Sequence, residues 1–174
     1  MTIDVPSLVT AAGGEIVGKV RLQKIVYLLD QLGLNSGFSY EYRHYGPYSE
    51  DLADEVEGDR IFGRIKADQK YRQRDGVPYV VYGVGDPSKG DPTDRHPFPD
   101  DLREALAEMN RCSATVLELA ATMHWLKVVE HLDNWRAELN KRKGVKAEEG
   151  RDNEALELLR KLELPPAVDS AVLA

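Results

Sequence analysis

The sequence predicts an α+β fold that is mainly helical and has a small antiparallel sheet in its first half. Apolar residues recur at helical spacing over 19–32. Segments 61–70 and 78–84 alternate as strands do and flank Asp75-Gly76, a dipeptide typical of a hairpin turn. The order of these elements resembles a winged-helix arrangement followed by C-terminal helices. This analogy concerns the fold and does not define a function.

The first elements follow from local signals in the chain. A short helix is expected over 4–13, because Gly13-Gly14 would end it. The helix over 19–32 is the strongest prediction, with Gly33 as its C-cap. Its apolar face is formed by Leu22, Ile25, Val26, Leu29 and Leu32. Strand-like alternation follows over 38–45.

The stretch after this strand predicts a strand-to-helix junction. Gly46-Pro47 is expected to end the strand, because proline cannot donate a hydrogen bond to a ladder. Ser49 is suited to cap a helix over 50–57, whose first turn carries acidic residues that favour the positive end of the helix dipole. Gly58 is expected to end that helix.

The second half is expected to be helical. Residues 85–99 contain four prolines and predict a loop. Helices are predicted over 99–110, 113–129, 130–142 and 152–163, with a charged linker over 141–150. We therefore expect one domain over 1–164, made of a first part (1–84), a loop (85–98) and a helical part (99–164), and a flexible tail over 165–174.

The composition is that of a soluble globular protein of the cytoplasm. Hydrophobic residues make up 42% and charged residues 30%, which fits a chain with a buried core. Cys112 is the single cysteine, so no internal disulfide can form. No apolar run is long enough to span a membrane, and the first residues lack the pattern of a signal peptide.

Charge is both negative overall and unevenly distributed. The net charge of −7 argues against nucleic-acid binding over the whole surface, because phosphate binding needs a cationic face. Nucleic acid remains possible only through a local basic patch. Acids are concentrated at Glu50, Asp51, Asp54, Glu55, Glu57 and Asp59, and bases at Arg60, Arg64, Lys66, Lys70, Arg72 and Arg74. Such segregation can guide a charged partner, or it can be two solvated faces.

A search for catalytic and metal-binding patterns favours structural roles. Ser49 and His44 lie close in sequence, but a helix cap explains the serine more simply than a nucleophile does. Cys112 is interpreted as an inert residue at a helix junction. His124 and His131 belong to no recognised metal motif, and no phosphate-binding glycine loop occurs. We therefore expect no enzyme activity, no metal and no cofactor.

Two motifs resemble a bacterial family that contains YwgA-type proteins and the SocA-like antitoxin domain, also called Panacea. The motif residues are Leu22, Gln23, Lys24 and Tyr27 on a helix, then Tyr45, Gly46, Pro47, Tyr48 and Ser49 before an acidic helix. The resemblance covers residues 22–57 well, and the ending 155–164 also looks similar. It implies an antitoxin or another protein-interaction module rather than an enzyme.

The resemblance and the residues together define the candidate binding surface. We expect Gln23 and Lys24 to reach the loop after the strand and to bond its carbonyls. Tyr45 and Tyr48 are either presented rigidly as interface anchors or packed inside the domain. The partner-binding candidates are Tyr45, Tyr48, Asp51, Asp54 and Glu55.

Three functions follow from these observations. The first is a protein-binding module that neutralises a cognate toxin, with the acidic helix imitating nucleic-acid phosphates. The second is a winged-helix DNA-binding regulator that uses the basic run Arg60–Arg74. The third is an enzyme with an unrecognised site around His44, Tyr45 and Tyr48. No membrane partner is expected.

Overall fold

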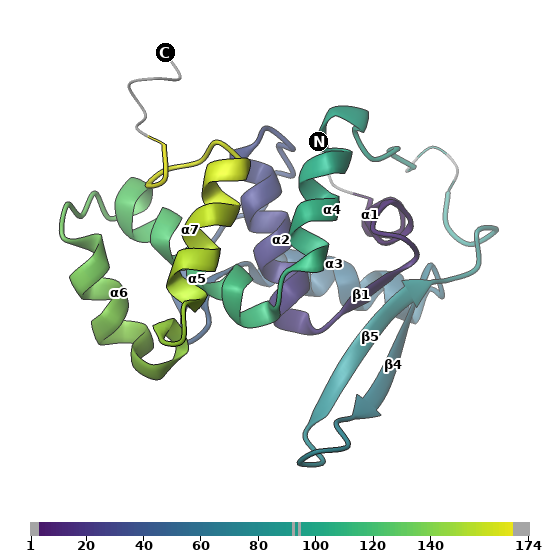
Figure 1. Cartoon of the computed structure of the whole chain (residues 1–174). Helices are drawn as coiled ribbons and strands as arrows, with labels where there is room; N and C mark the ends of the chain where they lie inside the picture. Colours follow the sequence, from purple (N-terminus) through teal and green to yellow (C-terminus); the bar gives the residue numbers. More distant parts are fainter. Residues whose placement is uncertain (1–3, 92, 94, 169–174) are drawn as a thin grey trace.

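The fold is α+β and mainly helical, as the sequence predicts (Figure 1). It is seen in a computed structural model that describes residues 4–91, 93 and 95–168. Within these residues, no helix has the length and apolar character needed to cross a membrane. Residues 169–174 of the predicted flexible tail lie outside the described part of the chain.

The first part of the chain has winged-helix topology. Its helices are α1 (Val5–Ala11), α2 (Lys19–Gln31) and α3 (Glu50–Ile61), and its main strands are β1 (Glu15–Val17), β4 (Ile65–Tyr71) and β5 (Pro78–Val84). The strands pair antiparallel in the order β1-β5-β4. Tyr82 on the central strand is opposite Ile16 on one side and Ala67 on the other. β1 has three residues and was not predicted, because so short a segment shows no alternation.

The predicted strand over 38–45 is wrong in its bounds, and so is the role given to Gly46-Pro47. Strand β2 (Glu41–Arg43) turns through two residues into β3 (Gly46–Tyr48), so this dipeptide belongs to a second strand. In a hairpin with a two-residue turn, the pair next to the turn is hydrogen-bonded and the following pair is not. Pro47 belongs to that following pair, opposite Tyr42, so its missing N–H breaks no ladder bond.

Several helix boundaries also differ from prediction. Helix α3 passes through Gly58 and ends at Ile61, because glycine weakens a helix without stopping it. The helix predicted over 130–142 starts only at Trp135, since His131 has a φ of 55°. The C-terminal elements are η2 (Asp100–Leu102), α4 (Arg103–Arg111), α5 (Ala114–His124), the π-helical η3 (Trp125–Val129), α6 (Trp135–Lys143), η4 (Gly144–Ala147) and α7 (Arg151–Lys161).

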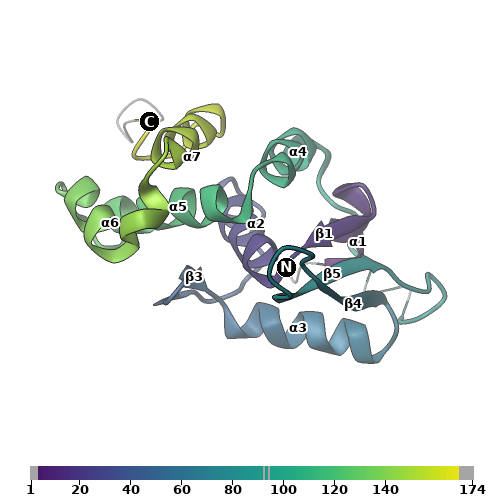
Figure 2. The ribbon, with the colours of Figure 1, turned by 60° about the horizontal axis from the view of Figure 1, so that its bottom comes forward.

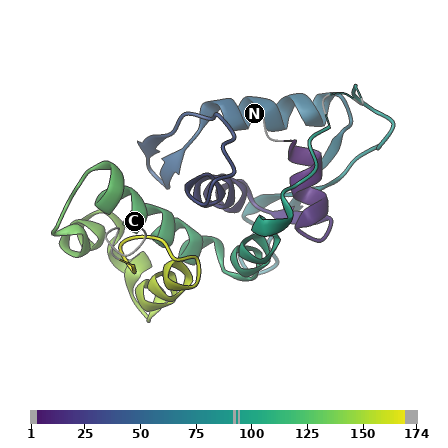
Figure 3. The same ribbon diagram turned by 90° about the horizontal axis from the view of Figure 1, so that it is seen from above.

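Helix α2 is the centre of the core. Residues 22–29 are all buried, and the helix packs against α4, α5, β1 and β3. Helices α6 and α7 both pack on α5, and the three form a group at one end of the molecule (Figure 3). Helix α3 runs along another side, away from this group, with the sheet beside it (Figure 2). The hairpin β2–β3 therefore connects the central helix to a helix whose outer side faces solvent.

Candidate protein-binding surface

Helix α2 holds the motif Tyr45–Ser49 through two buried polar side chains. The amide of Gln23 donates to the carbonyl of Ser49 at 2.8 Å and accepts from the N–H of Ser49 at 2.9 Å. The ammonium group of Lys24 donates to the carbonyl of Pro47 at 2.5 Å. The expectation that Gln23 and Lys24 reach this loop is confirmed. The two motifs are therefore halves of one structural unit.

Lys24 is unusual because its side chain is almost completely buried, with 1% of its surface exposed. Burial lowers the pKa of its ammonium group to about 8, while the nearby carboxylate of Glu118 opposes this shift. Burial also lowers the pKa of His124 to about 4, so this imidazole is neutral at pH 7. A hydrogen bond of 2.8 Å joins its Nδ1 to the hydroxyl of Tyr27. Beneath the hairpin, Lys24, Tyr27 and His124 are thus hydrogen-bonded, whereas the buried hydroxyl of Thr122 has no partner among the described residues.

The turn of the hairpin is held from the other side by the C-terminal helices. Lys143 forms a buried ion pair with Glu118 at 2.8 Å and donates to the carbonyl of His44 at 3.0 Å. Lys146 pairs with the same carboxylate at 3.0 Å, and its ammonium nitrogen lies 4.7 Å from the ring centre of Tyr45. The buried carboxylate of Glu118 therefore holds the two lysines that contact the turn residues His44 and Tyr45.

Gly46 is required where the hairpin meets α5. Its φ is 84°, a conformation that residues with a side chain rarely adopt. A Cβ atom at this position would lie 2.7 Å from the hydroxyl oxygen of Thr122. The close approach explains why glycine stands between the two tyrosines.

The two motif tyrosines have different surroundings. Tyr45 is 49% exposed, so of the two alternatives above it adopts the presented one. Tyr48 is half-buried, and the guanidinium of Arg43 lies 4.4 Å from its ring centre. Arg43 also pairs with Glu50 at the start of α3 at 2.8 Å. The aromatic hairpin and the acidic helix thus form one continuous surface.

Ser49 and Cys112 have structural positions. Ser49 is fully buried and caps α3, because its hydroxyl accepts from the N–H of Leu52 at 3.2 Å. The cap predicted from the sequence is confirmed. The thiol of Cys112 contacts the carbonyl of Glu108 at 3.4 Å, and burial raises its pKa. Neither group is arranged as a nucleophile.

The predicted acids of α3 have separate positions. Asp51 is exposed and accepts from the N–H of Ser39 at 3.2 Å, while Glu55 is half-buried beside a cavity. Asp54 is exposed and forms no hydrogen bond or ion pair with any residue that the structure describes. Residues three and four apart share a helix face, so the outer stripe of α3 consists of Asp54 with Glu50 and Glu57. Glu57 pairs with Arg60 at 2.5 Å and Glu50 with Arg43, so Asp54 is the acid of this stripe without a cationic partner among the described residues. Glu50 and Glu57 were not among the predicted binding residues.

Two exposed apolar residues next to this stripe were also missed. Ile61 is 66% exposed and Phe62 is 65% exposed. The strand predicted over 61–70 includes both residues, whereas β4 begins only at Ile65. The signal that could have identified them is the helical spacing of Ile61 from Glu50, Asp54 and Glu57.

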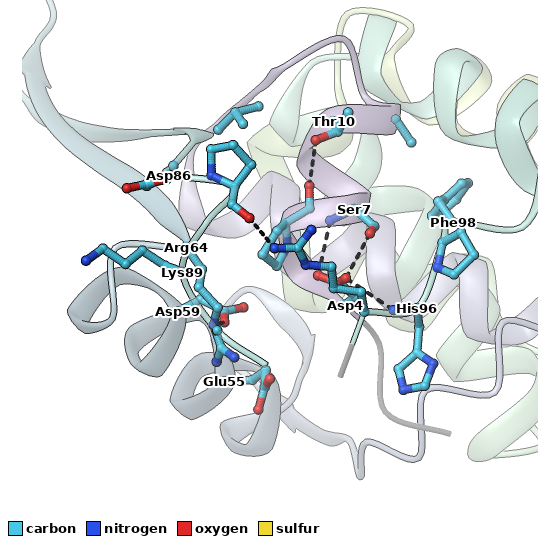
Figure 4. Close-up of a pocket in the computed structure, with 18 of the residues that line it drawn as sticks. Asp4, Ser7, Thr10, Glu55, Asp59, Arg64, Asp86, Lys89, His96 and Phe98 are labelled. Carbon is cyan, nitrogen blue, oxygen red and sulfur yellow. Dashed lines mark hydrogen bonds and ion pairs between the residues drawn. The ribbon is translucent and has the colours of Figure 1, made fainter. Parts of the chain in front are cut away.

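A cavity of about 550 Å³ with both polar and apolar lining lies between α1, α3 and the loop residues 85–91 and 95–98 (Figure 4). Asp59 and Arg64 form an ion pair at 2.5 Å at its base. Burial raises the pKa of Asp59 to about 6, although Arg64 opposes this shift. On the other wall, the carboxylate of Asp4 caps α1 by accepting from Ser7. Asp59, Arg64 and Asp4 thus have structural roles, in an ion pair and in a helix cap.

Metal-binding geometry is not found in this part of the chain or elsewhere in residues 4–91, 93 and 95–168. There, no group of three His, Cys, Asp or Glu side chains is placed to hold an ion.

Comparison with known proteins gives a distant relative. No protein-family model matches the chain. The chain is 27% identical to the uncharacterised protein YwgA of Bacillus subtilis (strain 168) over 119 residues, which are 67% of this chain and 69% of YwgA. The chain is therefore similar to YwgA, as its motifs indicate.

Proposed function

We propose that the protein is a non-catalytic, antitoxin-like binding module that neutralises a protein toxin by direct contact. The observation that carries this proposal is the acidic outer stripe of α3, formed by Glu50, Asp54 and Glu57. In a winged-helix fold, the helix before the wing commonly enters the major groove of DNA. Here that helix is α3, and its charge would repel phosphates. A basic protein surface is the complementary partner.

The stripe also has the spacing of a phosphate mimic. Its three carboxylates follow each other at intervals of about 5 Å along the helix axis. A toxin that acts on DNA or RNA carries a basic groove for phosphates, and α3 would occupy that groove. Tyr45, held on the neighbouring hairpin by Lys146, would add an aromatic anchor at the edge.

The non-catalytic part of the proposal is supported by the state of the reactive side chains. Lys24, Ser49 and His124 are all buried. Lys24 and Ser49 are hydrogen-bonded to the hairpin or α3, and His124 to Tyr27. A catalytic group must be able to reach its substrate, and these groups are already used inside the protein.

The test is an affinity pull-down of the tagged protein from its own host, with mass spectrometry of the eluate. We expect one stoichiometric protein partner, whose retention falls as salt increases. The double variant Asp54→Lys/Glu57→Lys should lose this partner. Asp101→Lys/Glu104→Lys makes the same change of charge at two exposed acids elsewhere and should keep it. An eluate without a stoichiometric protein partner would sink the proposal.

A DNA-binding regulator is the second candidate, and the fold itself favours it. The strand order β1-β5-β4 and the projecting β4–β5 wing agree with a winged helix (Figure 1). The wing and its turn carry four exposed bases: Lys66, Lys70, Arg72 and Arg74. A gel-shift series with mixed-sequence duplex DNA tests this function. Binding with a steep dependence on salt supports it, and no binding at low salt excludes it.

A further inference from the structure

Ile61 and Phe62 form an exposed apolar corner at the end of α3. About two thirds of each side chain's surface is accessible to solvent. The guanidinium carbon of Arg64 lies 5.7 Å from the ring centre of Phe62, and Arg64 is itself held by the buried Asp59. The ring therefore rests on a fixed neighbour while most of its surface stays in water. Exposed apolar residues of this size are common at protein interfaces.

The corner continues the acidic stripe of α3. Ile61 lies four residues after Glu57, so it belongs to the same helix face as Glu50 and Asp54. At a rise of 1.5 Å per residue, the acidic part is about 10 Å long, and Ile61 follows about 6 Å further along the axis. The surface thus has a direction, with acids first and an apolar end.

We propose that Glu50, Asp54, Glu57, Ile61 and Phe62 form one docking face, called here the α3 face, for a protein that presents a row of Lys or Arg side chains ending in an apolar contact. This inference rests on the proposed function and specifies the chemistry of its partner. Glu50 and Glu57 are paired with Arg43 and Arg60, but α3 as a whole has more acids than bases, and this excess argues for a basic occupant. The aliphatic side chain of Ile61 beside Phe62 suits an apolar side chain of a protein partner. A nucleic-acid base can stack on an aromatic ring, but the phosphates beside it would meet repulsion along the acids of α3.

The two parts of the face have different roles in binding. Exposed charges mainly speed up association and set its dependence on salt, whereas a buried aromatic anchor slows dissociation. We therefore expect Asp54→Lys to lower the association rate and Phe62→Ser to raise the dissociation rate. Because both residues are exposed, neither change should lower the melting temperature.

The experiment uses the full chain and two synthetic helical peptides of about 18 residues, long enough to hold helical structure in part. One peptide carries lysines at i, i+4 and i+7 and leucine at i+11, and the other has serine in place of the leucine. By surface plasmon resonance, we expect the leucine peptide to bind about tenfold more tightly, a difference of about 1.4 kcal/mol. This preference should vanish in Phe62→Ser and remain in Tyr71→Ser, since Tyr71 is an aromatic of similar exposure (63%) that lies outside the proposed interface.

Three results of the peptide experiment would overturn the inference. These are no binding of either peptide, equal binding of both, or a leucine preference that persists in Phe62→Ser. A dimer that light scattering detects and that Phe62→Ser dissociates would assign the face to a second copy of the chain instead. The proposed function fails separately: it fails when the host pull-down yields no protein partner. If Phe62→Ser still retains the pulled-down partner in full, the α3 face is not the docking site. The proposed function as a binding module would still hold in that case.

Discussion

The ammonium nitrogen of Lys24 lies 2.5 Å from the carbonyl oxygen of Pro47, and this contact joins the central helix to the middle of the hairpin motif. Lysine is rarely buried, because its charge loses hydration. Here the charge is retained next to a carbonyl dipole and near Glu118. The two sequence motifs are thus joined by hydrogen bonds in space.

Replacing Lys24 with methionine should lower the free energy of unfolding by about 1–3 kcal/mol, because the buried carbonyl of Pro47 would lose its donor. Methionine keeps most of the volume, so a cavity contributes little. Urea denaturation measures this change. Lys19→Met on the same helix is the control, since Lys19 is exposed and should change stability by less than about 0.5 kcal/mol. Equal effects of the two variants would contradict the structural role of Lys24.

Replacing Gly46 with alanine should destabilise the protein by about 2–4 kcal/mol, through a strained backbone and a clash with Thr122. Gly37 has the same φ of 84° but open space around its Cβ position. Gly37→Ala therefore measures the backbone strain alone, at about 1–2 kcal/mol.

The clash at Gly46 can be tested separately. Adding Thr122→Ala to Gly46→Ala removes the atom that the new methyl group meets, so the double variant should regain part of the lost stability. Thermal unfolding of the four proteins gives the comparison. No recovery in the double variant would mean that backbone strain alone explains the effect.

The sequence predicts the parts of the fold that depend on local patterns. The apolar spacing of α2, the cap at Ser49 and the β4–β5 hairpin are all confirmed. These features arise within a few turns or within one hairpin, where spacing and side-chain type largely determine the conformation.

The sequence does not predict contacts between distant segments. Tyr27 and His124 are 97 residues apart, and Glu118 and Lys143 are 25 residues apart. Neither pair forms a motif, because its partners meet only after the helices have packed. The apolar role of Ile61 and Phe62 was missed for a related reason: a helix and a strand both accept such residues, and only the observed end of α3 separates the two.

Acid should destabilise the protein through His124. Its pKa falls from 6.5 in the unfolded chain to about 4 in the folded protein, so the unfolded state binds more protons between these values. Stability therefore decreases as pH falls from 6.5 to 4, by up to about 3 kcal/mol. Urea denaturation across this range should show a steeper decrease for the wild type than for His124→Asn.

Asp59 acts in the opposite direction and must be separated from His124. Its pKa rises to about 6 in the folded protein, so its protonation adds stability as pH falls. Because Asp59 is present in both proteins, the difference between wild type and His124→Asn reports the histidine. Parallel curves for the two proteins would contradict the buried neutral imidazole.

Replacing Glu118 with leucine should destabilise the protein by about 3–5 kcal/mol. The change leaves the buried ammonium group of Lys143 without its carboxylate partner. The double variant Glu118→Leu/Lys143→Met removes both charges of this pair and should recover part of this loss, because an apolar pair of similar volume often replaces a buried ion pair at little cost. Recovery is incomplete because Lys146 and the buried Lys24 still lose the carboxylate. Urea denaturation of the wild type, both single variants and the double variant gives the coupling energy. If the double variant loses the sum of the two single losses, the two side chains act independently and the pair does not anchor the turn that carries Tyr45.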